Sequence, residues 1–214
     1  MHRTLRPELL DSLPPDHPDA LHNRRDLRLT NAIIGTPRWL ERTLRRVMRP
    51  GEVALEIGAG TGELGLRLAA ANIAVDGLDL WPRPGKWPVE RVWHRADLRT
   101  FDGYDRYPVI IANLILHQFP DTELAMLGQR LRRHVRVLVA AEPARRRVSQ
   151  VLFRGIAPLL GANHVSLHDA HVSIGAGFQG DELPRLMGFN LHEWAVDRRT
   201  TTLGVYRLTA VRRE

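Results

Sequence analysis

The sequence predicts an α/β protein with a doubly wound, mostly parallel sheet of seven strands and an antiparallel last strand. Three observations lead to this fold class. Short apolar segments alternate with amphipathic helical segments between residues 53 and 141, as in right-handed crossover connections. Residues 109–114 are continuously apolar, which is typical of a central parallel strand covered on both faces. The last two predicted strands are joined by residues 197–200 alone, too short a link for a crossover helix, so they must be antiparallel.

The first 50 residues are expected to form a helical cap, and residues 51–214 a ligand-binding domain. A proline-rich break at residues 13–18 divides the cap, and apolar residues recur at helical spacing between residues 19 and 48. Gly35-Thr36-Pro37 interrupts this second part. Thr36 is the expected N-cap and Pro37 the first helical residue.

The other elements follow from periodicity and turn residues. Strands are expected at residues 53–57, 73–79, 89–96, 109–114, 135–141, 189–196 and 201–211, and helices at residues 63–72, 122–134 and 181–187. Residues 144–180 are an insertion with an apolar helical stretch. We expect this insertion, with Trp39 and the N-terminal helices, to cover an apolar acceptor pocket like a lid.

Composition limits the class of protein. The 214 residues are 43% hydrophobic, enough for one domain with a sizeable core. No apolar run approaches the ~18 residues of a membrane span, and the N-terminus lacks the apolar region of a secretory signal. Cysteine is absent, which excludes disulfides and thiolate metal sites. We therefore expect a cytoplasmic location and no metal.

The formal charge of +7 comes from arginine, because Lys86 is the only lysine. Arginines cluster at residues 45–46, 132–133, 145–147, 198–199 and 212–213. A nucleic-acid or anionic-lipid surface is one interpretation. Since the clusters lie on separate predicted elements and aromatic residues make up only 6%, we favour solvated helix faces and expect no nucleic-acid partner. The sequence does not decide the oligomeric state, and a homodimer stays open.

A glycine loop, Gly58-Ala59-Gly60-Thr61-Gly62, lies between the first predicted strand and the following helix. Such a loop brings backbone N–H groups close to a ligand. Dinucleotide-binding loops are related, but their third glycine would fall on Glu63, whose charge would repel a pyrophosphate.

Two carboxylates follow the next strands. Asp79 ends the second strand, 23 residues beyond Glu56, where it can accept hydrogen bonds from both hydroxyls of a ribose. Asp97-Leu98 follows the third strand, where Asp97 can accept from an adenine amino group while Leu98 packs on the ring. The alternative for Asp97 is that it caps a turn.

These residues together resemble class I S-adenosyl-L-methionine (SAM)-dependent methyltransferases over roughly residues 50–211. Residues 53–62 are similar to motif I of that family, Leu78-Asp79-Leu80 to motif II and Arg95-Ala96-Asp97-Leu98 to motif III, and residues 113–119 resemble the fourth-strand segment of small-molecule members. The resemblance implies a Rossmann-like fold in which Glu56 contacts the methionine amino group, Asp79 the ribose and Asp97 the adenine. The implied cofactor-binding residues are Glu56, Gly58, Ala59, Gly60, Gly62, Asp79, Leu80, Asp97, Leu98 and Asn113.

Two narrower resemblances concern the acceptor. Residues 23–31 and His168-Asp169 are similar to segments of methyltransferases encoded beside type III polyketide synthases. Leu116-His117 resembles a feature of ubiquinone/menaquinone-type methyltransferases. Both imply a hydrophobic aromatic, phenolic or quinone-like acceptor, as in secondary metabolism.

Methylation of a phenol needs a general base, and histidine has a suitable pKa. His117, at the carboxyl edge of the fourth strand, is our first catalytic candidate and His168 the second; a structural or exposed histidine is the alternative for each. The Asn/Asp-Pro-Pro-aromatic signature of nucleobase N-methylation is absent, which leaves O- or C-methylation. We expect a small-molecule methyltransferase, with an RNA methyltransferase or a SAM-binding protein without turnover as alternatives.

Overall fold

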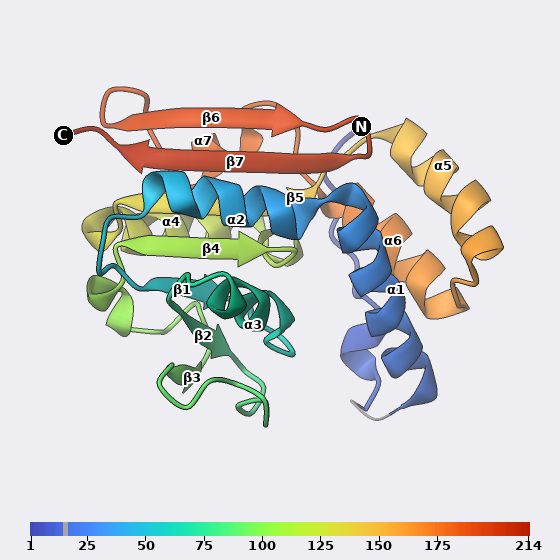
Figure 1. Cartoon of the computed structure of the whole chain (residues 1–214). Helices are drawn as coiled ribbons and strands as arrows, with labels where there is room; N and C mark the ends of the chain where they lie inside the picture. The colour runs from blue at the N-terminus through green and yellow to red at the C-terminus, as the bar shows by residue number, and fades with distance from the viewer. Residues whose placement is uncertain (15–16) are drawn as a thin grey trace.

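The structure is a computed structural model that describes residues 1–14 and 17–214, and it is built on one seven-stranded sheet (Figure 1). The strand order is β3-β2-β1-β4-β5-β7-β6. The five strands β1 to β5 all run parallel to one another, whereas β7 is antiparallel to both of its neighbours, β5 and β6. The strands are β1 (Ala54–Ile57), β2 (Val75–Asp79), β3 (Trp93–Arg95), β4 (Val109–Asn113), β5 (Val137–Pro143), β6 (Trp194–Thr200) and β7 (Val205–Arg212). The predicted fold class is confirmed.

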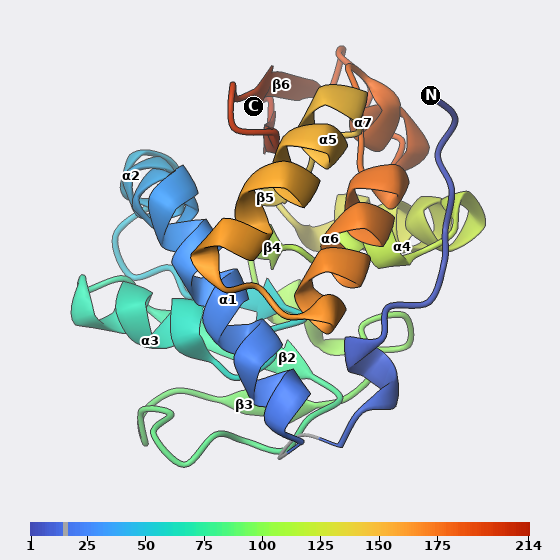
Figure 2. The same cartoon turned by 90° about the vertical axis from the view of Figure 1, so that its right-hand side faces the viewer.

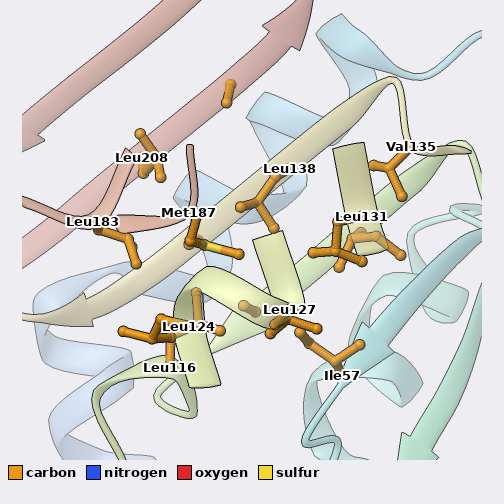
Figure 3. Close-up of a cluster of buried hydrophobic side chains, with 14 of the residues drawn as sticks. Ile57, Leu116, Leu124, Leu127, Leu131, Val135, Leu138, Leu183, Met187 and Leu208 are labelled. Atoms are coloured by element: carbon orange, nitrogen blue, oxygen red, sulfur yellow. The ribbon is translucent and has the colours of Figure 1, made fainter. Parts of the chain in front are cut away.

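Helices cover both faces of the sheet. α2 (Thr36–Val47) and α3 (Glu63–Ala70) lie on one face, and α4 (Asp121–His134) and α7 (Glu182–Leu186) on the other (Figure 1). Alternate residues of β4 serve the two cores: Val109 and Ile111 pack under α2 and α3, while Ile110 packs towards α4. Figure 3 shows the leucines of α4 against β5 and Met187.

A third group of helices gathers at the end of the sheet to which β4 points (Figures 1 and 2). It consists of α1 (Pro18–Ile34), α5 (Arg147–Ile156) and α6 (His164–Ala176). Polar contacts join α1 to α6, including Ser166 Oγ to Asp26 over 2.7 Å. The short 3₁₀ helices are η1 (Leu10–Ser12), η2 (Gly103–Arg106), η3 (Leu116–Gln118) and η4 (Ala157–Leu160). The ligand-binding edge expected of this fold therefore lies under α1, α5 and α6.

The N-terminal region differs from the sequence prediction in two respects. Residues 1–9 are not helical; they run along α6, and the Thr4 N–H donates to Gly175 O over 3.1 Å. The predicted N-cap at Thr36 is wrong by one residue, because Gly35 (φ +73°) ends α1 and precedes α2, whose first residue is Thr36. Glycine takes this left-handed conformation without steric cost.

The C-terminal hairpin is present, but its turn lies four residues later than predicted. Residues 197–200, the predicted link, belong to β6, and the turn falls at residues 201–204 with Gly204 at φ +81°. Residues 189–193 are not part of a strand, and residues 191–193 form a turn. Arg198 and Arg199 are charged residues of the kind that is common in loops. They lie on β6 at the edge of the sheet, where exposed charges oppose pairing with other chains.

The third strand is also shorter than predicted, because it covers only Trp93–Arg95 of residues 89–96.

Among the described residues, no helix has both the length and the apolar character required to cross a bilayer.

Candidate functional site

The glycine loop turns sharply at the end of β1 and leaves open space beside Gly60. Gly58, Gly60 and Gly62 all have positive φ, at +66°, +56° and +75°. A Cβ on Gly58 would lie 2.4 Å from Ile115 Cγ1, so only glycine fits there. A Cβ on Gly60 would meet nothing within 4 Å. The space beside Gly60 is where a ligand can approach the backbone.

Trp87 holds the other side of the loop. It is only 4% exposed, and its ring would lie 2.4 Å from a Cβ on Gly65 and 2.9 Å from one on Gly62. Its ring packs edge to face on Trp93 at 4.9 Å between centroids. The proline-rich connection after β2 therefore folds back onto the loop and the start of α3.

Asp79 ties the end of β2 to the loop. Its Oδ2 accepts the Gly60 N–H over 2.6 Å, and its Oδ1 accepts the Trp81 N–H over 2.9 Å. Each carboxylate oxygen keeps a further lone pair for a ligand hydroxyl. The next residue, Leu80, is 64% exposed at the same strand end. Ala59 is buried, and its N–H donates to Leu78 O over 3.2 Å.

Glu56 and Asn113 present two buried oxygens without a partner, Oε2 of Glu56 and Oδ1 of Asn113. Glu56 is the last residue but one of β1, and Asn113 is the last residue of the neighbouring parallel strand β4. Burial is the main reason that the pKa of Glu56 is raised to about 8, and the charge of Asp79 adds to the rise. A backbone hydrogen bond from Gly65 acts in the opposite direction and lowers this pKa. Buried acceptors without donors are costly. Both oxygens therefore fit a ligand that donates hydrogen bonds or carries positive charge, such as an ammonium group.

Asp97 has a different partner from the one that the resemblance implies. Its carboxylate receives Arg99 Nε over 3.0 Å and Arg99 Nη2 over 2.6 Å, and this hydrogen bonding lowers the pKa of Asp97. Leu98 is 7% exposed and its side chain packs in the core with Phe101 and Tyr104. The adenine role of these two residues stays a prediction.

His117 lies in η3, directly after β4, and both of its ring nitrogens face carboxylates. Nδ1 lies 2.7 Å from Glu142 Oε2, and Nε2 lies 3.3 Å from Glu8 Oε1. The side chains of His117 and Glu142 are 4% and 0% exposed. Burial alone would lower the pKa of His117, but the hydrogen bonds to Glu142 and Glu8 outweigh it and raise the pKa to about 9. At neutral pH the ring is therefore an imidazolium.

Glu142 also shapes the backbone that carries His117. Its carboxylate accepts the N–H groups of Ile115, Leu116 and His117 over 3.1, 2.9 and 3.3 Å. The preceding residue, Leu114, has a left-handed φ of +58°, which costs about 1 kcal/mol or more for a leucine. These hydrogen bonds offset that strain and fix the turn after β4.

Glu8 reaches His117 from the N-terminal segment, residues 1–9. Its carboxylate also accepts the hydroxyl of Ser173 on α6, and despite burial these hydrogen bonds lower the pKa of Glu8. A cavity of about 320 Å³ adjoins the pair. It is lined by Leu5, Arg6, Pro7, Glu8, His117, Gln118, Pro120, Val172, Ser173 and Ala176.

His168, the second catalytic candidate, lies on α6 with its side chain 43% exposed. It is not among the described residues that line the cavity beside His117. Its neighbour Asp169 is buried and accepts the N–H groups of Leu9 and Leu10 over 2.7 and 3.0 Å. Asp169 thus anchors the N-terminal segment, His168 Nδ1 lies 3.1 Å from Asp169 Oδ1, and the structure does not bring His168 together with His117.

The sequence prediction missed Glu142, Glu8 and Trp87. Glu142 had a usable signal, since it is an acidic residue that directly follows the apolar fifth strand. Glu8 had none, because its contact with His117 joins residues 109 positions apart. Trp39 packs on the hydrophobic core that α2 and α3 cover, with the Arg207 guanidinium 5.1 Å from its ring, and it is not among the described residues that line the cavity beside His117. Its expected role in an acceptor pocket stays a prediction.

No protein-family model and no curated protein matches the chain. Solved structures do. The plantazolicin methyltransferase BpumL in complex with SAH (S-adenosylhomocysteine) aligns with a TM-score of 0.74 and 11% identity, covering 96% of this chain and 93% of that one. Magnesium protoporphyrin IX methyltransferase (ChlM) from Synechocystis PCC 6803 with bound SAH aligns with a TM-score of 0.61 and 18% identity, covering 88% and 86%.

A third structure comes from work on the conversion of a disulfide bond into a thioacetal group during echinomycin biosynthesis. It aligns with a TM-score of 0.56 and 22% identity, covering 81% of this chain and 80% of that one. At these identities the likeness concerns the fold, and the chain has the fold of the class I SAM-dependent methyltransferases.

Proposed function

We propose that this protein is a SAM-dependent methyltransferase that acts on a small, hydrophobic aromatic, phenolic or quinone-like acceptor. The observation that carries the proposal is the pair of unpartnered buried oxygens of Glu56 and Asn113, beside a glycine loop with free space at Gly60. A SAM ammonium group would satisfy both oxygens, and its positive charge would favour the ionised form of Glu56. Asp79 would accept the ribose hydroxyls, and Asp97 the adenine amino group once Arg99 moves aside.

SAM, when bound, supplies an electrophilic methyl group on a sulfonium. The protein then contributes mainly position and orientation, since methyl transfer is an in-line displacement. The loop from Gly58 to Gly62 would hold the cofactor over the end of β1, and Glu56 would orient its amino-acid part. The acceptor would lie towards the end of β4, on the side of His117.

The acceptor proposal rests on the cavity beside His117. Its volume of about 320 Å³ is at the lower end of the range of small-molecule sites. Apolar lining from Leu5, Pro7, Val172 and Ala176 suits a ring system, and two of the structural neighbours are methyltransferases of plantazolicin and of magnesium protoporphyrin IX. O- and C-methylation both remain within the proposal.

His117 would act on the acceptor through Nε2, the ring nitrogen that now faces Glu8. Glu142 keeps Nδ1–H in place, which fixes the tautomer and the plane of the ring. When an acceptor hydroxyl replaces the carboxylate of Glu8, the His117 ring loses one anionic neighbour and its pKa falls from about 9. With its pKa lowered, the ring would release its Nε2 proton to solvent, and the neutral Nε2 would then take the acceptor hydroxyl proton as general base. For an acceptor that binds already ionised, the imidazolium would instead stabilise the oxyanion.

Titration of SAM into the purified protein by calorimetry tests the cofactor site. Gly60→Arg places a cationic side chain in the open space and should abolish SAM binding. Gly51→Arg is the matched control, because Gly51 also has a positive φ (+82°) and open surroundings but lies in the turn before β1. If Gly60→Arg folds and binds SAM like Gly51→Arg, the proposed cofactor site is wrong.

Turnover with a panel of phenols, quinones and aromatic polyketides tests the acceptor. We expect methylation of at least one member and loss of it in His117→Gln, with SAM binding retained. SAM binding with no turnover across the panel would instead favour the SAM-binding protein without turnover. Salt-dependent RNA binding with RNA methylation would favour the RNA methyltransferase.

A further inference from the structure

The outward face of α5 is apolar and exposed along its whole length. Five apolar side chains of α5 and η4 are between 51% and 84% exposed: Val148, Val151, Leu152, Ile156 and Leu159. Their spacing puts them on one side of the helix. No residue of α5 is buried. We call these five residues the α5 face.

The α5 face points away from the rest of the molecule. Gln150, Phe153 and Ala157 lie on the opposite side of the helix, where Gln150 Nε2 donates to His171 O on α6 over 3.1 Å and Ala157 is buried. α6 is the α-helix with which α5 makes its main contacts. In Figure 2, α5 lies in front of the other helices, nearest the viewer. A contiguous exposed apolar surface of this kind marks an interaction site.

The segment that carries this face has charged side chains of one sign. Residues 144–168 contain no aspartate or glutamate, and they include Arg145, Arg146, Arg147 and Arg154. Arg146, Arg147 and Arg154 are exposed, and Arg147 and Arg154 form no ion pair with any residue that the structure describes. An open hollow of about 440 Å³ at the start of α5 is lined by Arg146, Arg147, Val148 and Thr202, among others. The apolar stripe is therefore bordered by unneutralised positive charge.

We propose that α5 and η4 dock the protein onto the surface of an anionic lipid bilayer. An amphipathic helix with apolar residues on one face and arginines at its border lies in the plane of the lipid headgroups and buries its apolar face. The α5 face enters the acyl boundary, and Arg146, Arg147 and Arg154 meet the lipid phosphates. A second copy of the chain fits less well, because two α5 faces would bring like charges together with no acidic residue of this segment between them.

One arginine cluster has a different interpretation in the structure. The clusters do lie on separate elements, as expected, but Arg147 shares α5 with exposed Arg154 and with the apolar face, and exposed Arg146 directly precedes that helix. The spacing of charged residues in the sequence does not predict this surface, because it depends on the exposure of the apolar residues in the fold. The inference stands independently of the proposed methyl transfer.

Co-sedimentation of the full chain with vesicles tests the proposal. We expect binding to phosphatidylcholine vesicles with about 30% phosphatidylglycerol, and at least tenfold weaker binding to pure phosphatidylcholine. Binding should weaken between about 0.1 M and about 0.5 M salt. The double variant Val151→Glu/Leu159→Glu should lose at least tenfold in affinity, and Arg147→Gln/Arg154→Gln about fivefold per arginine.

Met126→Glu on α4 is the matched control, because Met126 is also 60% exposed on a helix but lies on another face. Melting temperatures and light scattering accompany each variant. Binding that is lost in both double variants and kept in Met126→Glu supports the proposal. The proposal is overturned if the wild type does not bind anionic vesicles, or if Val151→Glu/Leu159→Glu binds them as well as the wild type. It is also overturned if the wild type is a dimer that binds no vesicles and Val151→Glu/Leu159→Glu is a monomer.

Discussion

Replacement of Glu8 by glutamine tests the coupling between the N-terminal segment and His117. The change removes one of the two carboxylates that hold the imidazolium, and it keeps the size of the side chain. Nε2 of His117 lies 3.3 Å from Glu8, whose side chain is 13% exposed, so solvent screens the pair only weakly. We expect Glu8→Gln to lower the pKa of His117 from about 9 towards its ordinary value of 6.5.

The magnitude follows from linkage. A rise in the pKa of His117 from 6.5 to about 9 corresponds to about 3 kcal/mol of stabilisation of the folded protein. Because that pKa is raised, the stabilisation is complete below about 6.5 and is lost as the pH rises through about 9. Glu8 has a lowered pKa, so its contribution is lost only as the pH falls below its ordinary range. If Glu8 supplies about half, Glu8→Gln costs 1–2 kcal/mol at about pH 6 and much less at about pH 10.

Urea unfolding at these two pH values measures the effect, and the imidazole titration of His117 by NMR measures the pKa directly. Glu193→Gln is the control, since it removes an equal charge from an exposed glutamate in the turn before β6. Equal destabilisation of Glu8→Gln at both pH values, or an unchanged titration of His117, would refute the coupling.

Four further predictions concern the rest of the site. Glu142→Gln should lower the free energy of unfolding by about 2–4 kcal/mol, because buried N–H groups and the His117 ring lose their acceptor, and it should reduce kcat more than SAM affinity. Trp87→Ala should cost about 3–5 kcal/mol in a denaturant melt and weaken SAM binding, since the loop loses its packing. In calorimetry, Asp97→Ala should weaken SAM binding while Arg99→Gln preserves or improves it; equal affinities would remove Asp97 from the site. Since the pKa of Glu56 is about 8, SAM binding at neutral pH should release a proton, detected as a dependence of the binding enthalpy on buffer.

The sheet could be predicted because its signals are local. The apolar segments of β1, β4 and β5 are bounded by turn residues, and the short link between the last strands excludes a crossover. The turn itself was misplaced because Asp197, Arg198 and Arg199 have the composition of a loop, whereas an edge strand carries the same residues for a different reason. The first nine residues were misassigned because tertiary contacts, such as the one between Thr4 and Gly175, determine their path.

The residues of the candidate site also differ in how far the sequence could predict their positions. Glu56, the glycines and Asp79 lie at or next to strand ends, and parallel strands bring their carboxyl ends to one edge, so their proximity follows from topology. Glu142 reaches the same edge through the pairing of β4 with β5. Glu8 belongs to no regular element and meets His117 only through the fold of the whole chain. Sequence patterns locate residues on periodic elements, and they do not locate partners that a loop delivers.

The two sides of the proposed site differ in how well their polar atoms are satisfied. Towards the cofactor, Glu56 and Asn113 each leave a buried oxygen unpaired and Gly60 leaves open space, so a ligand gains hydrogen bonds there without breaking any. Towards the acceptor, both nitrogens of His117 are already engaged. An acceptor at Nε2 must displace Glu8, whose segment is also held by Arg3 on the carbonyl oxygens of His117 and Phe119 over 3.0 and 2.7 Å. On the proposed function, binding of an acceptor at Nε2 therefore requires the N-terminal segment to move.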